Sequence, residues 1–140
     1  MTVTKSHVCV RYAETDQMGV VHHAVYPIWF ELARTDFIKV IGLTYSQMEQ
    51  DGILLPVAEL TARYRIPAKY EDELTVETHI EKITPARIVF GYRIYRDNDP
   101  EKTVMVEGTS THAWVDRTMR PMNMKKIHPE LYSKIAALAE

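Results

Sequence analysis

The chain has 140 residues, of which 46% are hydrophobic and 26% are charged, and its formal net charge is −2 at pH 7. A chain of this length is expected to form one domain, residues 1–140, that buries roughly 68–70% of its unfolded surface. The balanced charge argues against nucleic acid or an anionic membrane surface as a partner, because each favours a clear basic excess. No apolar run approaches the ~18 residues that span a membrane, and the amino terminus has no signal-like apolar stretch. We therefore expect no integral membrane segment and a cytoplasmic location.

The first predicted elements are a strand and a long helix. The strand covers residues 7–12, and a polar loop containing Gly19 follows it. Over residues 24–41 the apolar side chains recur about every 3.6 positions, which predicts one amphipathic helix. Pro27 fits the first turn of this helix, and Gly42 is expected to end it in the left-handed conformation. The residues expected on the polar side of the helix are Glu31, Arg34, Thr35 and Lys39.

A short second helix and four strands complete the chain. Ser46 and Glu49 have the spacing of a capping box, which predicts the short helix. Pro56 interrupts the first of the four strands and is tolerated only at an edge or a bulge. A terminal helix is expected to begin at Pro129. The four strands are predicted over residues 53–64, 74–80, 88–94 and 104–115, the last being the longest without an interruption.

This order of elements predicts the fold class. Strands that follow one another without alternating helices favour an antiparallel sheet over a parallel one. We therefore expect an α+β fold in which a sheet of about five strands packs against one long helix. Because a single helix covers only one face, the remaining face or edge needs a partner, and we expect a homo-oligomer.

The candidate chemistry lies in the segment Tyr12-Ala-Glu-Thr-Asp16-Gln-Met-Gly19-Val-Val-His-His23. It places the carboxylate of Asp16 just ahead of the long helix, whose start at residues 22–25 has no Ser, Thr, Asp or Asn to cap it. Free N–H groups at a helix start can hold an oxygen that becomes negative, while a carboxylate acts as nucleophile or activates water. This combination suits attack on a thioester, because a thiolate leaves without a strong general acid.

Each of these residues also has an ordinary structural interpretation. Asp16 could be a turn or capping aspartate, and water could satisfy the N–H groups at the helix start. His23 could act through its backbone N–H or its ring, and we favour the N–H. Tyr12 is expected in the first strand, with its hydroxyl at the edge of the site. Adjacent histidines at a helix start are expected to diverge and no HExxH pattern follows, so we expect no metal.

The segment resembles the hotdog-fold acyl-CoA thioesterases, specifically the 4-hydroxybenzoyl-CoA thioesterase and YbgC-like branch. The likeness covers about residues 5–118. It is carried by Tyr12 to Asp16, Gly19-Val-Val, His23, Glu31-Leu-Ala-Arg34, Ile41-Gly42 and residues 64–72. Gln17-Met18 departs from the smaller residues of many relatives, which leaves the acyl-group preference open.

This resemblance implies a hotdog fold, in which the sheet wraps around the long helix, with a C-terminal helix added here. Two subunits are expected to pair into one continuous sheet with the active sites shared between them. Asp16 would lie at the start of the helix, and the acyl chain would enter the dimer seam. Tyr12 and His23 match positions that the YbgC-like members associate with the site.

The resulting hypothesis is an acyl-CoA thioesterase that releases the free acid and CoA. Asp16 is the nucleophile or general base, the His23 N–H is the oxyanion donor, and Tyr12 completes the catalytic group. No cofactor is expected, since CoA is part of the substrate. We expect a homodimer with shared active sites that assembles further into a tetramer. The candidate substrate-binding residues are Gly19, Val20, Arg117 and Arg120.

Alternatives remain for the basic segment and for the reaction. Residues 117–126 contain no acid and could hold CoA phosphates, or could be a solvated basic loop. An enoyl-CoA hydratase of the same fold is disfavoured, because the Asn-Pro of its Asp-x-Asn-Pro-x-His pattern is absent. A non-catalytic acyl-thioester-binding protein is a further alternative, and the intact carboxylate argues weakly against it.

Overall fold

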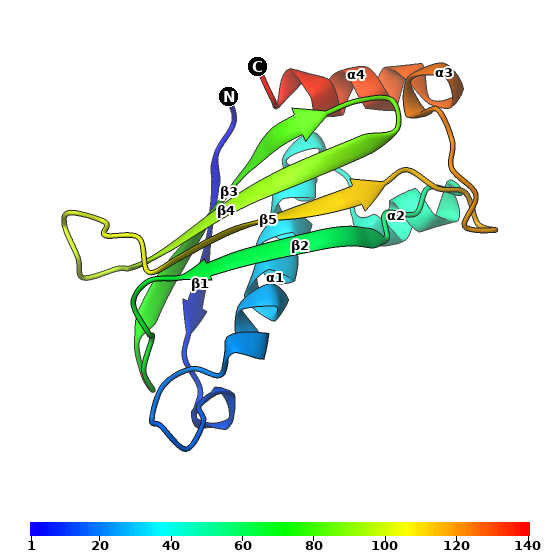
Figure 1. The fold of residues 1–140 in the computed structure, drawn as a ribbon. Coiled ribbons are helices and arrows are strands. Elements are labelled where there is room, and N and C mark those ends of the chain that lie inside the picture. The colour runs from blue at the N-terminus through cyan, green and yellow to red at the C-terminus, as the bar shows by residue number, and fades with distance from the viewer.

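One long helix, α1 (Tyr26–Ile38), lies against one face of a five-stranded sheet in the computed structural model, which describes residues 1–140 (Figure 1). The strands are β1 (Thr4–Cys9), β2 (Val57–Tyr64), β3 (Glu73–Ile83), β4 (Arg87–Arg96) and β5 (Val106–Ala113). Their order in the sheet is β1-β3-β4-β5-β2, and all neighbouring strands are antiparallel. The predicted α+β class and the antiparallel sheet on one long helix are confirmed.

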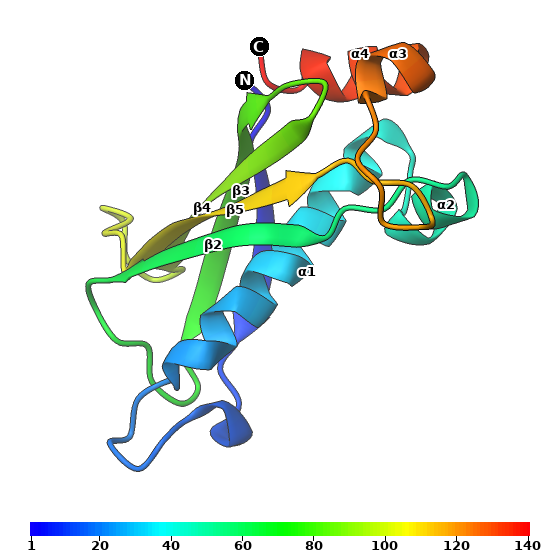
Figure 2. The same ribbon diagram turned by 45° about the vertical axis from the view of Figure 1, so that its right-hand side comes forward.

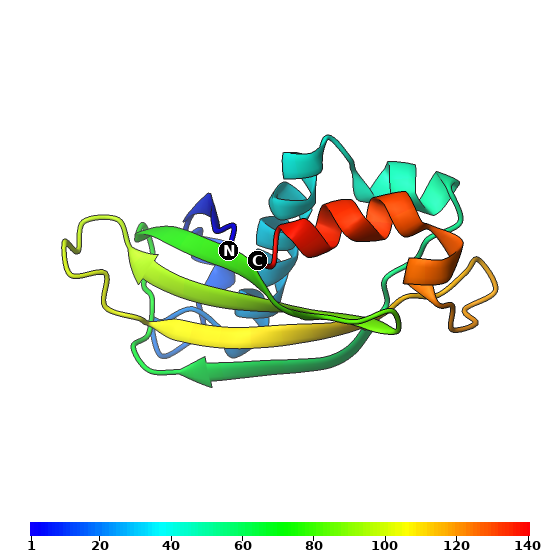
Figure 3. The ribbon, with the colours of Figure 1, turned by 90° about the horizontal axis from the view of Figure 1, so that it is seen from above.

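The shorter helices lie on the same side of the sheet as α1, and the opposite face of the sheet carries no helix (Figure 3). The C-terminal helices cross the end of the β3–β4 hairpin near the amino terminus, where the Thr2 N–H donates to the Leu138 carbonyl at 2.9 Å. None of the helices has the length and apolar character needed to cross a membrane. The shorter helices are α2 (Tyr45–Gln50), α3 (Met124–Ile127), α4 (Pro129–Ala137) and the 3₁₀ turns η1 (Tyr12–Glu14), η2 (His23–Val25) and η3 (Lys39–Ile41).

The hydrophobic core lies between α1 and the inner face of the sheet. Alternation along β4 turns Ile88, Phe90, Tyr92 and Ile94 inward, and all four are buried. Phe30 of α1 stacks on Tyr92 with ring centroids 4.3 Å apart. Each fully buried side chain of this size contributes roughly 1.5–3 kcal/mol, so this packing fixes the position of α1 on the sheet.

Several details differ from the predicted elements. The longest strand is β3 with 11 residues, whereas β5 has 8, because its neighbour β4 begins at Arg87 opposite Ala113. The capping residue of α2 is Thr44 rather than Ser46, and its hydroxyl accepts the Gln47 N–H at 3.1 Å. Arg34, expected on the polar side of the helix, is buried. Gly42 ends the helical stretch with φ of 79°, as predicted.

The strand β2 forms one edge of the sheet. It bonds only to β5, and the register shifts between Val57 and Glu59, just after Pro56. The predicted edge position of this strand is therefore confirmed. Nearly all of its residues are exposed, including the apolar Val57, Leu60 and Tyr64. An exposed edge with apolar side chains is open to pairing with another strand.

Candidate active site

The loop before α1 folds into a tight turn at Asp16. The Oδ1 atom of Asp16 accepts the Met18 N–H at 2.9 Å, and its backbone carbonyl accepts the Gly19 N–H at 2.9 Å. Gly19 has φ of 81°, a left-handed conformation that glycine adopts without strain. The Oδ2 atom of Asp16 accepts no hydrogen bond from the chain. One oxygen of this half-buried carboxylate therefore fixes the turn, and the other is left for a ligand.

Glu14 fastens this loop to the helix. Its buried carboxylate accepts the Arg11 backbone N–H at 2.8 Å, the Arg11 guanidinium at 3.4 Å and the Trp29 indole N–H at 3.2 Å. Its backbone carbonyl accepts the His22 N–H at 2.9 Å. Burial acts to raise the pKa of Glu14, but the hydrogen bonds from Arg11 and Trp29 outweigh it and hold the pKa below its ordinary value. An ionised Glu14 thus holds both ends of the loop.

The start of the helix has a cap that the sequence did not reveal. The Nδ1 atom of His22 accepts the Ala24 N–H at 3.1 Å, and the His22 carbonyl accepts the Val25 N–H at 2.9 Å. The expectation of an uncapped start is therefore wrong at Ala24, because a neutral imidazole can accept a hydrogen bond as Asn or Ser does. The rings of His22 and His23 also stack, with centroids 4.3 Å apart, instead of diverging. The N–H of His23 takes part in none of these bonds.

A cavity of about 210 Å³ opens beside the turn and the helix start. Asp16 and His23 both line it, so the carboxylate and the residue expected to donate to the oxyanion face one space. Tyr64 also lines it, and its hydroxyl donates to the His23 carbonyl at 3.0 Å. Apolar side chains form most of the wall. The lining residues are Asp16, Met18, Val20, Val21, His23, Tyr26, Tyr64, Arg65, Ile66 and Pro67.

The other predicted residues of the Asp16 segment have different places. Val20 lines the cavity, whereas Gly19 shapes the turn and does not line it. Tyr12 lies outside the cavity, 76% exposed, with its ring edge-on to Tyr70. Its expected place in the first strand is wrong, because β1 ends at Cys9 and Glu14 draws the chain into the 3₁₀ turn η1.

Arg117 and Arg120 are far from this cavity within one chain. Both are exposed in the loop after β5, and the guanidinium of Arg117 donates to the Gln50 carbonyl at the end of α2. Figure 1 shows that loop beside α2, away from the loop that precedes α1. A role of these arginines in binding CoA phosphates stays a prediction.

Comparison with known proteins identifies the family. The sequence matches the model of the Thioesterase-like superfamily over residues 10–135. The chain belongs to this superfamily. The putative acyl-CoA thioesterase YneP of Bacillus subtilis is 40% identical over 134 residues, which cover 95% of each chain. The acyl-CoA thioester hydrolase YbgC of Escherichia coli is 30% identical over 124 residues, 89% of this chain and 87% of the relative.

Solved structures support the same conclusion. A DHNA-CoA thioesterase from Staphylococcus aureus matches with a TM-score of 0.88 and 33% identity over 99% of this chain and 93% of that chain. A hypothetical protein, TT1821, from Thermus thermophilus matches with a TM-score of 0.86 and 34% identity over 96% and 98%. The predicted hotdog fold, family and enzyme class, a thioester hydrolase, are confirmed by these likenesses.

Part of the thioesterase cavity was not predicted from the sequence. Tyr26 and residues 64–67 line it together with Asp16, and the ring of Tyr26 packs against that of Tyr64 with centroids 5.4 Å apart. The Tyr26 hydroxyl accepts the Ala68 N–H at 3.2 Å, which ties this segment to the helix. The resemblance included residues 64–72 only as support for the fold. Their contacts with the helix start join residues 41 and 42 positions apart, Tyr64 with His23 and Ala68 with Tyr26, and local patterns do not encode such pairs.

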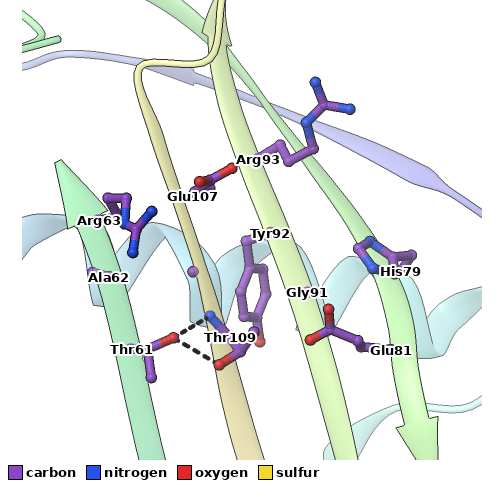
Figure 4. A pocket seen from close by; sticks show the side chains of 11 residues that line it. Thr61, Ala62, Arg63, His79, Glu81, Gly91, Tyr92, Arg93, Glu107 and Thr109 are labelled. Atoms are coloured by element: carbon purple, nitrogen blue, oxygen red, sulfur yellow. Dashed lines mark hydrogen bonds between the residues drawn. The ribbon is translucent and has the colours of Figure 1, made fainter. Parts of the chain in front are cut away.

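A second hollow lies elsewhere, on the sheet face that carries no helix (Figure 4). It measures about 560 Å³ and has a mostly polar floor in which Arg63, Arg93 and Glu107 lie close together in the view. The ring of His79 covers Gly91, where a side chain would overlap it. Only 2 of the hollow's 11 lining residues are hydrophobic, compared with 6 of 10 in the cavity beside Asp16, so it offers little apolar surface for an acyl group.

One cluster of side chains could offer metal ligands. His7, Glu73 and Asp97 place ligand atoms within 4.8 Å of one another. The Nε2 atom of His7 lies 3.2 Å from Glu73 and its Nδ1 atom lies 2.8 Å from Asp97. One ion cannot use both ring nitrogens, so the imidazole is arranged as a bridge between two carboxylates. The cluster does not include Asp16, His22 or His23.

Proposed function

We propose that this thioesterase hydrolyses an acyl-CoA to the free acid and CoA in the cavity shared by Asp16 and His23. The proposal rests on two residues that line one mostly apolar cavity. The Oδ2 atom of Asp16 accepts no hydrogen bond from the chain, and the backbone N–H of His23 donates none. The names of its relatives support the substrate, since YneP is described as a putative acyl-CoA thioesterase and YbgC as an acyl-CoA thioester hydrolase.

The chemistry follows from these groups. With the thioester carbonyl oxygen at the His23 N–H, the Oδ2 atom of Asp16 either attacks the carbonyl carbon or takes a proton from an attacking water. The first route gives a mixed anhydride that water then hydrolyses, and the second gives the acid directly. In both, the C–S bond breaks and the thiolate of CoA receives a proton. A single oxyanion donor typically lowers the barrier by about 2.7–4 kcal/mol.

We further propose that two subunits share these sites by pairing their β2 edges, and that dimers assemble into the expected tetramer. The unpaired edge and its exposed Val57, Leu60 and Tyr64 support the pairing. Ile28 and Leu32 of α1 are also exposed and would be covered in such a seam. Light scattering after size-exclusion chromatography measures the assembly, and a monomer at assay concentration would contradict it. A cytoplasmic location stays part of this proposal.

The test is release of CoA, followed with a thiol reagent over a panel of acyl-CoAs. Asp16→Asn keeps an oxygen that can accept the Met18 N–H but removes the charge. It should lower kcat/KM by about 10²–10⁴-fold, the usual contribution of a general base. Asp51→Asn, an exposed acid outside this cavity, is the matched control and should leave the rate unchanged.

Other outcomes of this assay point to the alternatives. Wild-type turnover in folded Asp16→Asn would refute the role of Asp16. Hydration of crotonyl-CoA without CoA release would favour a hydratase. Saturable binding of acyl-CoA without either product would favour a binding protein.

A further inference from the structure

His22 makes three hydrogen bonds in the loop that leads into α1. Its N–H donates to the Glu14 carbonyl at 2.9 Å, its carbonyl accepts the Val25 N–H at 2.9 Å, and its ring Nδ1 accepts the Ala24 N–H at 3.1 Å. Of the three N–H groups that follow His22, only that of His23 is left without a partner in the chain. The bonds of His22 thus determine which N–H group at this turn stays available for a ligand.

The two peptide planes on either side of His23 are both held in place. In a trans peptide the carbonyl and the N–H point in opposite directions, so a bond to one of them also fixes the other. The first plane is held where the His22 carbonyl accepts from Val25, which directs the His23 N–H away from Val25. The second plane is held from both sides, by the Tyr64 hydroxyl on the His23 carbonyl and by the His22 ring on the Ala24 N–H. The His22 ring is therefore part of the frame that orients the His23 N–H.

The ring of His22 can accept this bond in only one state. A neutral imidazole with its proton on Nε2 has a lone pair at Nδ1, whereas an imidazolium carries an N–H on both nitrogens. Protonation would place an N–H of the ring against the Ala24 N–H and break the bond between them. Histidine is the side chain that ordinarily changes charge between pH 5 and 8. The cap on Ala24 therefore depends on the charge state of the ring.

No carboxylate lies within ion-pair distance of the His22 ring. The ring stacks on that of His23, with centroids 4.3 Å apart. Figure 2 shows that the segment after β2 runs beside the start of α1, where it adds the cation of Arg65 to the cavity. The titratable and charged groups that the loop, the helix start and the end of β2 bring to this site are Arg11, Glu14, Asp16, His23, Tyr64 and Arg65. A charged His22 ring would thus meet a second imidazole and no counter-ion that could keep it at Ala24.

We propose that His22 is a positioning residue that holds the oxyanion donor of His23 in place only while its imidazole is neutral. Protonation of His22 releases the Ala24 N–H and frees one end of the second peptide plane. Hydrolysis should therefore slow as the pH falls, through kcat more than through KM, because the donor acts on the oxyanion that forms in the transition state. This inference rests on the proposed function of the cavity that Asp16 and His23 line.

The experiment measures kcat and KM for CoA release between about pH 5.5 and 8.5 in the wild type, His22→Asn and His22→Ala. Asparagine is a strong N-cap residue whose amide oxygen accepts an N–H and does not titrate. His22→Asn should keep kcat within about threefold of the wild type at pH 8, and the ratio of its kcat to that of the wild type should rise about fivefold by pH 5.5. His22→Ala, without a cap, should lower kcat about tenfold at pH 8 and change KM by less than about twofold. Asp16 is the same in all three proteins, so its own protonation cancels in these ratios.

His128→Asn is the matched control. His128 occupies the cap position ahead of α4, but its ring accepts no hydrogen bond there. The substitution should leave the pH profile of kcat unchanged. Parallel profiles for the wild type and His22→Asn would overturn the inference, and so would a His22→Asn protein as slow as His22→Ala at pH 8. If His22→Ala fails to fold in a urea titration, the profile of His22→Asn alone decides.

Absence of turnover with every acyl-CoA of the panel would instead refute the proposed hydrolysis. The backbone amide of Ala24 then decides whether His22 is a pH-dependent cap, because that test needs no substrate. The amide NMR signal of Ala24 should move with pH in step with the ring signals of His22 in the wild type, and should move much less in His22→Asn. An Ala24 signal that does not follow the titration of His22 would overturn the inference.

Discussion

Trp29 donates its indole N–H to the carboxylate of Glu14 at 3.2 Å, which joins the first turn of α1 to the loop that carries Asp16. Both side chains are buried. Because the same carboxylate accepts two bonds from Arg11, one ionised group determines where the turn begins. The geometry of the cavity beside Asp16 therefore depends on a residue that does not line it.

Glu14→Gln should lower both stability and activity. The amide keeps the size of the side chain but replaces one acceptor with a donor, which leaves Arg11 or Trp29 unpaired. Loss of a hydrogen bond to a charged group costs about 1.5–3 kcal/mol. Urea unfolding at pH 7 measures the stability, and CoA release measures the activity. Glu130→Gln, an exposed acid on α4, is the control and should behave like the wild type.

The lowered pKa of Glu14 also determines how folding stability changes at acidic pH. The folded state holds the pKa below the ordinary value of 4.5, so the unfolded state binds the proton more readily. Its contribution is complete above pH 4.5 and is lost as pH falls through the folded pKa. Glu14→Gln should therefore lose less stability than the wild type over this acidic range. Parallel losses in the two proteins would contradict the pKa shift.

His112 should make stability depend on pH in a higher range. Burial, the largest cause, and the charge of Arg34 lower its pKa from 6.5 to about 4, although the bond to Leu55 acts in the opposite direction. Between pH 6.5 and about 4, His112 is protonated in the unfolded state but stays neutral in the folded state. Stability is thus complete above pH 6.5 and falls towards pH 4, with a slope of up to about 1.4 kcal/mol per pH unit.

His112→Asn provides the test of this titration. The amide can still donate to the Leu55 carbonyl but does not titrate. We expect about 1–3 kcal/mol lower stability at pH 7, because the hydrogen bond between the ring and Ser110 is disturbed, and a flatter profile between pH 6.5 and 4.5. Urea midpoints across this range give the profile. Equal slopes in wild type and variant would show that His112 is not the titrating group.

The sequence predicted the elements whose determinants are local. The 3.6-residue pattern located α1, and Pro27 and Gly42 bounded the helical stretch at its two ends. The strand predicted over residues 88–94 lies within β4. These features depend on neighbouring residues, so a single sequence is enough to show them.

The missed features depend on contacts between distant residues. Arg34 was expected in solvent because its partner, Tyr92, lies 58 positions away. The place of Tyr64 in the cavity was missed because its partner, His23, lies 41 positions away. The capping role of His22 was missed because histidine is not among the usual caps.

Two glycines of the sheet should respond differently to the same substitution. A Cβ on Gly108 would overlap the Thr61 carbonyl of the neighbouring strand and lie 2.9 Å from the ring of Phe30. A Cβ on Gly91 would meet only the His79 ring, which is a mobile side chain on the bare face. Gly108→Ala should cost about 1–3 kcal/mol or more, since backbone has to shift. Gly91→Ala should cost clearly less, and equal urea midpoints for the two variants would contradict this difference.

Gly19 and Gly42 form a matched pair that separates stability from catalysis. Their φ values are 81° and 79°, and a Cβ on either would meet no atom within 4 Å. Alanine at each should therefore cost a similar amount, about 1–2 kcal/mol, from left-handed strain alone. Only Gly19 belongs to the turn that orients Asp16, so only Gly19→Ala should lower kcat for CoA release. Urea unfolding and the thiol assay on both variants provide the measurement. A kcat equally unaffected in both would show that the turn does not control the carboxylate, and an equal fall in both would trace the effect to stability.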